Sequence, residues 1–294
     1  MENDPPRVIL CLDGSVALGE AAHEFPHWAN KEALLSGRVT TRVSGAVGEI
    51  VISNAEHKNA MTSEMWRQLR SAAEEMRAND YVRVVVVHGA EGTFVAGADI
   101  EEFRTMRQVG ESAVEYDRIT EDALAALATM PKPTVAAIEG YCIGGGVSIA
   151  VACDFQVADA ATRFQIPAAR LGISYPLGSL RRLVAQVGAA TAKRMIFTAS
   201  MLEAPMALSF GLISQVSEDL TETIAELTMT LAEVAPLSIA ATKALADALE
   251  NPATDYAELE EEAARLGAVT IASADYLEAL DAFDEKRKPN FQGR

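Results

Sequence analysis

Cysteine is scarce in this chain of 294 residues, which has only Cys11, Cys142 and Cys153. An odd number of sparsely spaced thiols gives neither a disulfide framework nor the paired spacing of a zinc site. The four histidines are also too scattered to suggest a metal centre. We therefore expect buried thiols and no bound metal.

Long apolar runs are missing as well. No stretch approaches the ~18 residues that a membrane span needs. The first residues, MENDPPRV, contain acids where a signal peptide carries basic and then apolar residues. These absences predict a soluble protein of the cytoplasm with no membrane partner. The composition, 49% hydrophobic and 23% charged, is that of an ordinary globular chain.

Basic residues are few compared with acidic ones. The chain has 25 Lys and Arg residues against 42 Asp and Glu residues, which gives a formal net charge of −17. A surface of that sign repels polyanions, so the sequence disfavours a nucleic-acid partner. An anionic small ligand would need a local basic patch. The stretch EKRKPNFQGR (285–294) offers one, with a solvated tail as the alternative interpretation.

Short β-branched runs alternate with helical patterns along the middle of the chain. Residues 38–54 predict two strands about a Ser-Gly-Ala turn, and Thr62 is placed to cap the helix that follows. Further strands are predicted within residues 82–89, 133–140 and 154–159, and helices at 111–130 and 144–152. Beyond about Leu220 the strands stop, and four helices are predicted at residues 221–234, 236–250, 254–267 and 272–286.

These patterns predict an α/β fold in three parts. Residues 1–36 show weak periodicity and form an N-terminal extension. Residues 37–220 form an α/β core, because strands, loops and helices follow one another there. Residues 221–294 form an all-helical C-terminal region.

Two glycine-rich loops follow predicted strands in the core. They read GAEGTFVAGADIEEF (89–103) and GYCIGGG (140–146), and each leads into a helix. A helix N-terminus presents unpaired N–H groups. Two such loops side by side can direct two donors at one oxygen, which is an oxyanion hole for an enolate or a tetrahedral intermediate. Each loop alone is equally well explained as a tight turn, and neither has the phosphate-binding pattern of a P-loop or of G-x-G-x-x-G.

Several segments, in this order, resemble the enoyl-CoA hydratase/isomerase family, also called the crotonase superfamily. They are FVAGADIEEF (94–103), PKPTVAAIEGYCIGGG (131–146), LGISYPLGSLRRLVAQVG (171–188) and GLISQV (211–216), and the resemblance runs from about Arg38 to the C-terminus. It implies a spiral of ββα units with a helical C-terminal trimerisation region, assembled as a homotrimer or as a homohexamer made of two trimers. It also implies an acyl-CoA thioester substrate, so that coenzyme A is part of the substrate and no separate cofactor is needed.

The resemblance assigns roles to individual residues. It gives the two oxyanion-hole N–H groups to Ala98 and Gly145. The segment HKNAM (57–61) matches the stretch whose backbone meets the adenine, with Lys58 placed for a CoA phosphate. The residues expected to contact the CoA moiety are His57, Lys58, Ala60, Ala96, Asp99, Ile100, Gly144 and Lys286. Asp99 is also expected to cap the short helix after the first loop.

The two glutamates of enoyl-CoA hydratases are missing. Ser148 stands at the first position, two residues after the glycine triplet, and Ala168 stands at the second, in FQIPAARLG (164–172). Tyr175 and Pro176 occupy the place where other members carry an acid. Hydration uses one group to activate water and another to protonate carbon, and paired carboxylates do both. The sequence therefore disfavours a standard hydratase mechanism.

What remains is the oxyanion hole together with Tyr175, with Ser148 as a further hydrogen-bonding group. Decarboxylation of a malonyl-type thioester fits these parts, because loss of CO2 leaves an enolate without any base. Bacterial methylmalonyl-CoA decarboxylases of the family are similar at Tyr175, at IFTAS (196–200) and at KRKPNF (286–291). They differ in having His at the position of Ala98 and an acid at that of Ser148.

Two alternatives stay open. A hydratase or isomerase could use a relocated acid, for which the candidates are Glu101, Glu102, Glu115 and Glu121. A catalytically silent acyl-CoA-binding scaffold would also keep the loops and lack the acids. Tyr175 would then only line the pocket. The acyl group is not fixed by the sequence.

Overall fold

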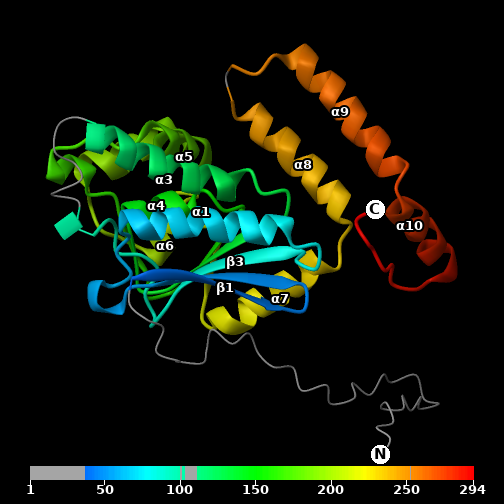
Figure 1. Ribbon diagram of the computed structural model, residues 1–294, viewed down its shortest axis with the longest axis horizontal. Coiled ribbons are helices and arrows are strands. Elements are labelled where there is room, and N and C mark those ends of the chain that lie inside the picture. The colour runs from blue at the N-terminus through cyan, green and yellow to red at the C-terminus, as the bar shows by residue number, and fades with distance from the viewer. Residues whose placement is uncertain (1–36, 100, 103–110, 252) are drawn as a thin grey trace, which may run out of the picture.

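A six-stranded sheet in the order β1-β2-β3-β4-β6-β9 runs through the centre of the computed structural model (Figure 1). The structure describes residues 37–99, 101–102, 111–251 and 253–294. The predicted N-terminal extension, Cys11 and Ile100 lie outside these residues. The strands are β1 (Arg38–Ser44), β2 (Val47–Ser53), β3 (Val84–Gly89), β4 (Thr134–Ile138), β6 (Phe155–Asp159) and β9 (Gln215–Ser217).

The predicted hairpin over residues 38–54 is confirmed, because β1 and β2 pair antiparallel around a tight turn. All the other neighbours in this sheet are parallel. A parallel sheet is normally covered on both faces, and β3 shows this directly. Val85 and Val87 pack into the larger of two apolar clusters, whereas Val84 and Val86 pack into a smaller one on the opposite face.

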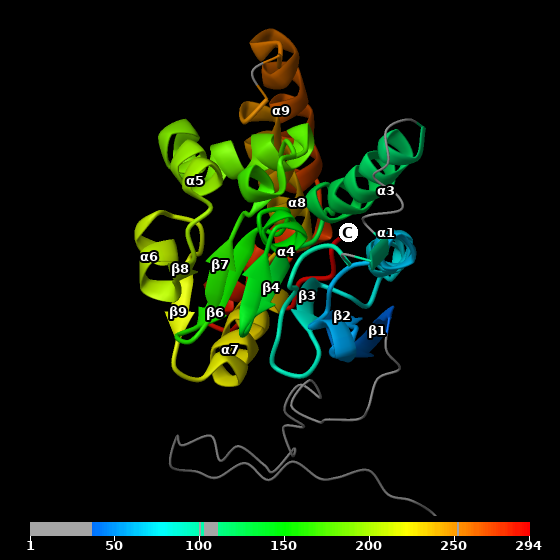
Figure 2. The same ribbon diagram turned by 90° about the vertical axis from the view of Figure 1, so that its left-hand side faces the viewer.

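Helices cover both faces of the sheet. Figure 2 shows α1 (Ser63–Ala78), α3 (Glu111–Ala128), α4 (Gly145–Ala150) and α5 (Leu177–Thr198) on one side, and α7 (Leu220–Ala232) on the other. Thr62 caps α1 as predicted, since its hydroxyl oxygen accepts a hydrogen bond from the Met65 N–H at 3.2 Å. Trp66 and Leu69 are buried on the face of α1 that packs into the larger apolar cluster.

A second, three-stranded sheet carries the glycine triplet. Its strands are β5 (Tyr141–Ile143), β7 (Arg163–Gln165) and β8 (Leu202–Glu203), in the order β5-β7-β8. Short elements lie next to these strands: the 3-10 helices η2 (Ala55–His57) and η3 (Ala168–Leu171), and the helix α6 (Ala204–Ser209). Because β5 ends at Ile143 and α4 begins at Gly145, the triplet joins the second sheet to the first residues of α4.

The C-terminal region is helical, as the sequence predicted. After α7 come α8 (Pro236–Leu249), α9 (Tyr256–Ile271) and α10 (Ala274–Glu285), and these three project beyond the sheet in Figure 1. Pro236 lies at the start of α8, where the missing N–H costs nothing. No single described helix is long and apolar enough to cross a membrane, although α7 and α8 together pass that test as a pair bent by 103°.

Candidate functional site

The two glycine-rich loops lie side by side, as the sequence predicted. A parallel bridge joins Val95 of the first loop to Cys142 of the second. The Val95 N–H donates to the Tyr141 carbonyl at 2.9 Å, and the Ile143 N–H donates to the Val95 carbonyl, also at 2.9 Å. These bonds bring the segment that contains Ala98 against the segment that leads into α4.

Each glycine of the triplet meets a different restriction. Gly144 has φ +53°, which residues with a side chain rarely adopt. A Cβ on Gly145 would lie 3.1 Å from Cζ2 of Trp66, so the indole of α1 packs behind this residue. A Cβ on Gly146 would lie 2.5 Å from the Val95 carbonyl oxygen, a distance that does not occur. The triplet therefore allows the close approach of the two loops.

The Ala98 N–H is oriented by its own peptide plane. The Gly97 carbonyl, which belongs to that plane, accepts a hydrogen bond from the Met61 N–H at 2.8 Å. In a trans peptide the N–H points opposite to the carbonyl, so the Ala98 N–H points away from Met61. The Asp99 N–H donates to the Met61 carbonyl at 2.9 Å and fixes the next plane.

The Gly145 N–H is available because of its place in α4. Gly145 is the first residue of that helix, and the first N–H groups of a helix have no partner within it. Both Gly145 and Ala98 are partly exposed. Two such donors on adjacent loops have the chemistry to polarise one carbonyl oxygen and to stabilise the negative charge that an enolate places on it.

Ser148 and Tyr175 form a hydroxyl pair beside this loop. Their oxygens are 2.7 Å apart. Each hydroxyl oxygen also lies 3.4 Å from the Gly144 carbonyl oxygen, to which it can donate a hydrogen bond. Ser148 is 3% exposed, while Tyr175 is partly buried. Burial raises the pKa of the Tyr175 hydroxyl well above its ordinary value, and the Ser148 hydrogen bond opposes that shift. Tyr175 is protonated at neutral pH, as a phenol ordinarily is, and it holds a proton that it can donate, although burial makes it a weaker acid than an exposed tyrosine.

The second missing glutamate position lies near the same loop. Ala168 begins η3 and is 4% exposed. Just before it, the Gln165 carbonyl accepts the Gly144 N–H at 2.8 Å, and Pro167 packs near Gly144. The fold thus brings Ser148 and Ala168 to the glycine triplet, and neither side chain is a carboxylate.

The candidate relocated acids have other partners. The Glu102 carboxylate accepts hydrogen bonds from the Ser63 N–H at 2.6 Å and from the Ser63 hydroxyl, at the start of α1. Glu115 pairs with Arg118 at 2.7 Å on α3. Glu121 pairs with Arg182 at 2.6 Å, across to α5. Glu101 is exposed. Arg182, the partner of Glu121, lies close enough for its charge to act on Tyr175.

The segment predicted to meet the adenine borders the first loop. The Ala96 N–H donates to the Lys58 carbonyl at 3.1 Å. The Lys58 ammonium lies 4.8 Å from the centre of the Tyr141 ring, a cation–π contact that the sequence did not predict. Ala60 is buried in the same turn.

Asp99 caps the following segment as predicted, and it has a second contact that was missed. Its Oδ1 accepts hydrogen bonds from the N–H groups of Glu101 at 3.0 Å and Glu102 at 3.1 Å. Its Oδ2 lies 2.6 Å from Nδ1 of His57. The pKa of Asp99 is lowered, since these hydrogen bonds outweigh the opposing effect of burial. The two residues are 42 positions apart, so no local pattern could indicate this pair.

Lys286 is not part of this group of residues. It follows the last turn of α10, and Figure 1 shows α10 well separated from α4 within one chain. Lys286 is exposed. Cys142 and Cys153 are buried free thiols, as predicted. Among the described residues there is no group of three or more His, Cys, Asp or Glu side chains that could hold a metal ion.

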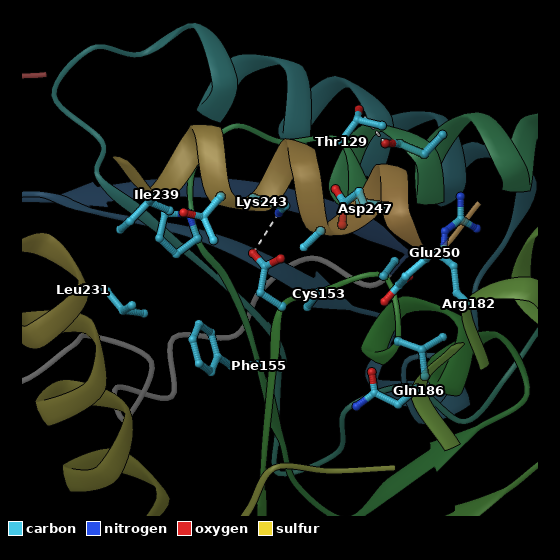
Figure 3. A pocket seen from close by; sticks show the side chains of 18 of the residues that line it. Thr129, Cys153, Phe155, Arg182, Gln186, Leu231, Ile239, Lys243, Asp247 and Glu250 are labelled. Carbon is cyan, nitrogen blue, oxygen red and sulfur yellow. Dashed lines mark hydrogen bonds and ion pairs between the residues drawn. The ribbon is translucent and has the colours of Figure 1, made fainter. Parts of the chain in front are cut away.

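A cavity lies elsewhere, between α8 and the core (Figure 3). Its volume is about 700 Å³, and neither the oxyanion loops nor the hydroxyl pair line it. Lys243 of α8 crosses to Asp154 with 2.7 Å between Nζ and Oδ2, the ion pair drawn in Figure 3. Burial raises the pKa of the nearby Asp247. This cavity separates the helical region from the core and is not the predicted site.

Comparisons with known proteins agree on one family. The sequence profile described as "Enoyl-CoA hydratase/isomerase" matches residues 42–294. The short-chain-enoyl-CoA hydratase of Clostridium acetobutylicum is 32% identical, over 83% of this chain and 93% of its own. The mitochondrial methylglutaconyl-CoA hydratase of Mus musculus is 31% identical, over 82% of this chain and 78% of its own. The crystal structure of an enoyl-CoA hydratase/carnithine racemase from Magnetospirillum magneticum has a TM-score of 0.82 at 31% identity, and the match covers 87% of this chain and 96% of the other.

Proposed function

The chain belongs to the enoyl-CoA hydratase/isomerase family, and we propose that it acts on an acyl-CoA thioester through an enolate held in an oxyanion hole. The observation that carries this proposal is the Val95–Cys142 bridge, which puts the two donor loops next to each other. The thioester oxygen binds to the N–H groups of Ala98 and Gly145. Negative charge that develops on this oxygen during the reaction is stabilised by donors that are already in place.

The Ser148–Tyr175 pair favours decarboxylation over hydration. In this reaction the bond between the α-carbon and the carboxylate breaks, CO2 leaves, and the electron pair enters the thioester enolate. The enolate then collapses as its α-carbon takes the Tyr175 proton. The Ser148 hydroxyl, 2.7 Å away, stabilises the tyrosinate and returns a proton that comes from solvent. No carboxylate base is needed at any step.

Hydration or double-bond isomerisation is the second candidate, and the names of the relatives favour it. Two proteins about 30% identical to this chain carry the name hydratase. The reaction would need another carboxylate, because Ser148 and Ala168 stand at the positions of the two missing glutamates. Among the candidate acids we favour Glu121, whose ion-pair partner Arg182 acts on Tyr175, and this ion pair would have to open before the carboxylate could take a proton from a substrate.

An oligomer would complete the site. We propose that the chain forms a homotrimer, or a hexamer of two trimers, through its C-terminal helices. The support is a set of exposed apolar side chains on α9 and α10, namely Val269, Ile271, Leu277, Leu280 and Phe283. Lys286, remote from the loops of its own chain, would then reach a CoA phosphate bound to a neighbouring copy. Light scattering coupled to gel filtration measures the number of copies directly.

Mass spectrometry of two incubations tests the reaction. Methylmalonyl-CoA should lose CO2, and Tyr175→Phe should slow its turnover by about 10²–10⁴ while the CoA ester still binds. Addition of water to crotonyl-CoA at an enzyme-like rate would instead establish the second candidate. If neither ester changes and both bind tightly, the protein either acts on another acyl group or is a silent acyl-CoA scaffold. If neither ester binds, the proposal of an acyl-CoA site is wrong.

A further inference from the structure

The turn that begins at His57 is joined to the Ala98 segment at both of its ends. At one end, the Met61 backbone N–H and carbonyl hold the two peptide planes that flank Ala98. At the other end, the His57 ring contacts the Asp99 carboxylate at 2.6 Å. Inside the turn, the Ala60 N–H donates to the His57 carbonyl at 3.0 Å. Together with the backbone of the two segments, these contacts form a closed ring. The peptide plane of the Ala98 N–H is part of that ring.

The contact between His57 and Asp99 joins an exposed side chain to a buried one. Asp99 is 6% exposed and already caps the segment after it through Oδ1, whereas Oδ2 is used by His57. The His57 side chain is 44% exposed, so its burial contributes little to the core. A contact of this kind at the rim of a site mainly restricts the movement of the loops that it joins.

We propose that His57 is a positioning residue that holds the Ala98 oxyanion donor through Asp99 and couples it to the turn at residues 57–61. This inference rests on the proposed function, in which the turn meets the nucleotide end of coenzyme A and Ala98 meets the thioester. Nucleotide bound to the turn restricts it, and the ring of contacts transmits that restriction to Ala98. The nucleotide therefore improves polarisation of a thioester that it does not touch.

A chromophoric thioester tests this without knowledge of the reaction. The probe is 4-dimethylaminocinnamoyl thioester, whose absorption moves to longer wavelength when its carbonyl accepts hydrogen bonds. It is prepared with coenzyme A and with pantetheine, which lacks the nucleotide. Spectra are recorded with protein in saturating excess, so that weaker binding does not reduce the signal. The wild-type protein should give a larger red shift with the CoA ester than with the pantetheine ester.

Three variants separate positioning from general damage. His57→Ala should lose roughly half of the CoA-ester shift, because one of the two donors is loosened, and should give the same shift with both esters. His57→Gln keeps a side-chain donor for Asp99 and should restore the difference. Glu56→Gln changes an exposed neighbour in the same turn and should behave as the wild type. A merely structural role for His57 would lower the thermal stability without removing the difference between the esters.

Two results would overturn what is proposed here. A full CoA-ester shift in His57→Ala would overturn the inference and leave the oxyanion hole intact. No shift with either ester in the wild-type protein would overturn the proposed oxyanion hole itself, and the positioning role of His57 with it.

Discussion

The hydroxyl oxygens of Ser148 and Tyr175 lie 2.7 Å apart, and both face the carbonyl of Gly144. Two neutral hydroxyls thus occupy a place where the resemblance to enoyl-CoA hydratases implies a carboxylate. A carboxylate repels an anionic acyl group and takes protons, whereas a protonated tyrosine donates one. This relationship is the reason to expect chemistry in which CO2, rather than a proton, leaves the α-carbon.

Removal of the Tyr175 hydroxyl should slow the reaction far more than removal of the Ser148 hydroxyl. Tyr175→Phe deletes the proton donor and should lower kcat by about 10²–10⁴, the usual contribution of general acid catalysis, with little change in KM. Ser148→Ala leaves Tyr175 bonded to the Gly144 carbonyl and should cost about tenfold, for one lost hydrogen bond to the developing tyrosinate. Steady-state rates of CO2 release measure both. Equal losses in the two variants would contradict the assignment of Tyr175 as the donor.

Two introduced glutamates should create or increase hydration activity. In the variant Ser148→Glu/Ala168→Glu, both carboxylates lie near the Gly144 loop, and addition of water to crotonyl-CoA should appear or rise at least about tenfold, because an acid and a base are both present. Each position is less than 5% exposed, so a loss of stability of about 1–3 kcal/mol is expected from overpacking. The matched control is Ser148→Gln/Ala168→Gln, which adds the same bulk without charge. Equal hydration by both double variants would contradict the argument.

The sequence predicted the elements whose signals are local. The hairpin over residues 38–54, the strand at 82–89 and the cap at Thr62 each depend on a few adjacent residues, and all three are confirmed. The C-terminal helices were also predicted, with ends shifted by a few residues. For example, Ser273 caps α10 and its side chain accepts the Tyr276 N–H, which moves the start of that helix to Ala274.

The helix α5 was missed for a physical reason. Its 22 residues include Gly178 and Gly188, and Gly188 breaks the helical backbone with φ +76°. A Cβ on Gly178 would lie 2.0 Å from the Glu121 carboxylate, so Gly178 faces the ion pair that joins α5 to α3. Glycine in a helix reduces the local signal, and a contact with a residue on another helix is not visible in the sequence.

The candidate site was only partly accessible to sequence reasoning. Its two loops were found because glycine is unusual, and their adjacency followed from their places after parallel strands. The pairs Ser148–Tyr175 and His57–Asp99 join residues 27 and 42 positions apart. Pairs of this kind depend on the path of the whole chain, and no spacing rule applies to them.

Alanine at two glycines should have opposite effects on stability. Gly146→Ala places a Cβ 2.5 Å from the Val95 carbonyl oxygen, so the two loops must separate, at a cost of about 1–3 kcal/mol together with loss of the red shift of the chromophoric thioester. Gly267→Ala in α9 meets nothing within 4 Å and should stabilise the chain by about 0.5–1 kcal/mol. Urea unfolding followed by circular dichroism measures both. A stable Gly146→Ala variant that keeps the red shift would mean that the contact between the loops is looser than described.

Replacement of Glu139 should stabilise the protein at neutral pH. This residue follows β4, and its pKa is raised, first by burial and then by the nearby charge of Asp159, while His88 acts in the opposite direction. A raised pKa means that the folded state binds the proton more tightly than the unfolded state, so the ionised carboxylate destabilises the fold. The free energy of unfolding should therefore increase as the pH falls through the raised pKa toward the ordinary value of glutamate. Glu139→Gln should remove this part of the pH dependence and raise the free energy of unfolding at pH 7.

Urea unfolding at several pH values from about 4 to 8 tests this, with the exposed Glu218→Gln as the control for the change in net charge. The same pH dependence in Glu139→Gln and in the wild-type protein would show that Glu139 is not the group responsible.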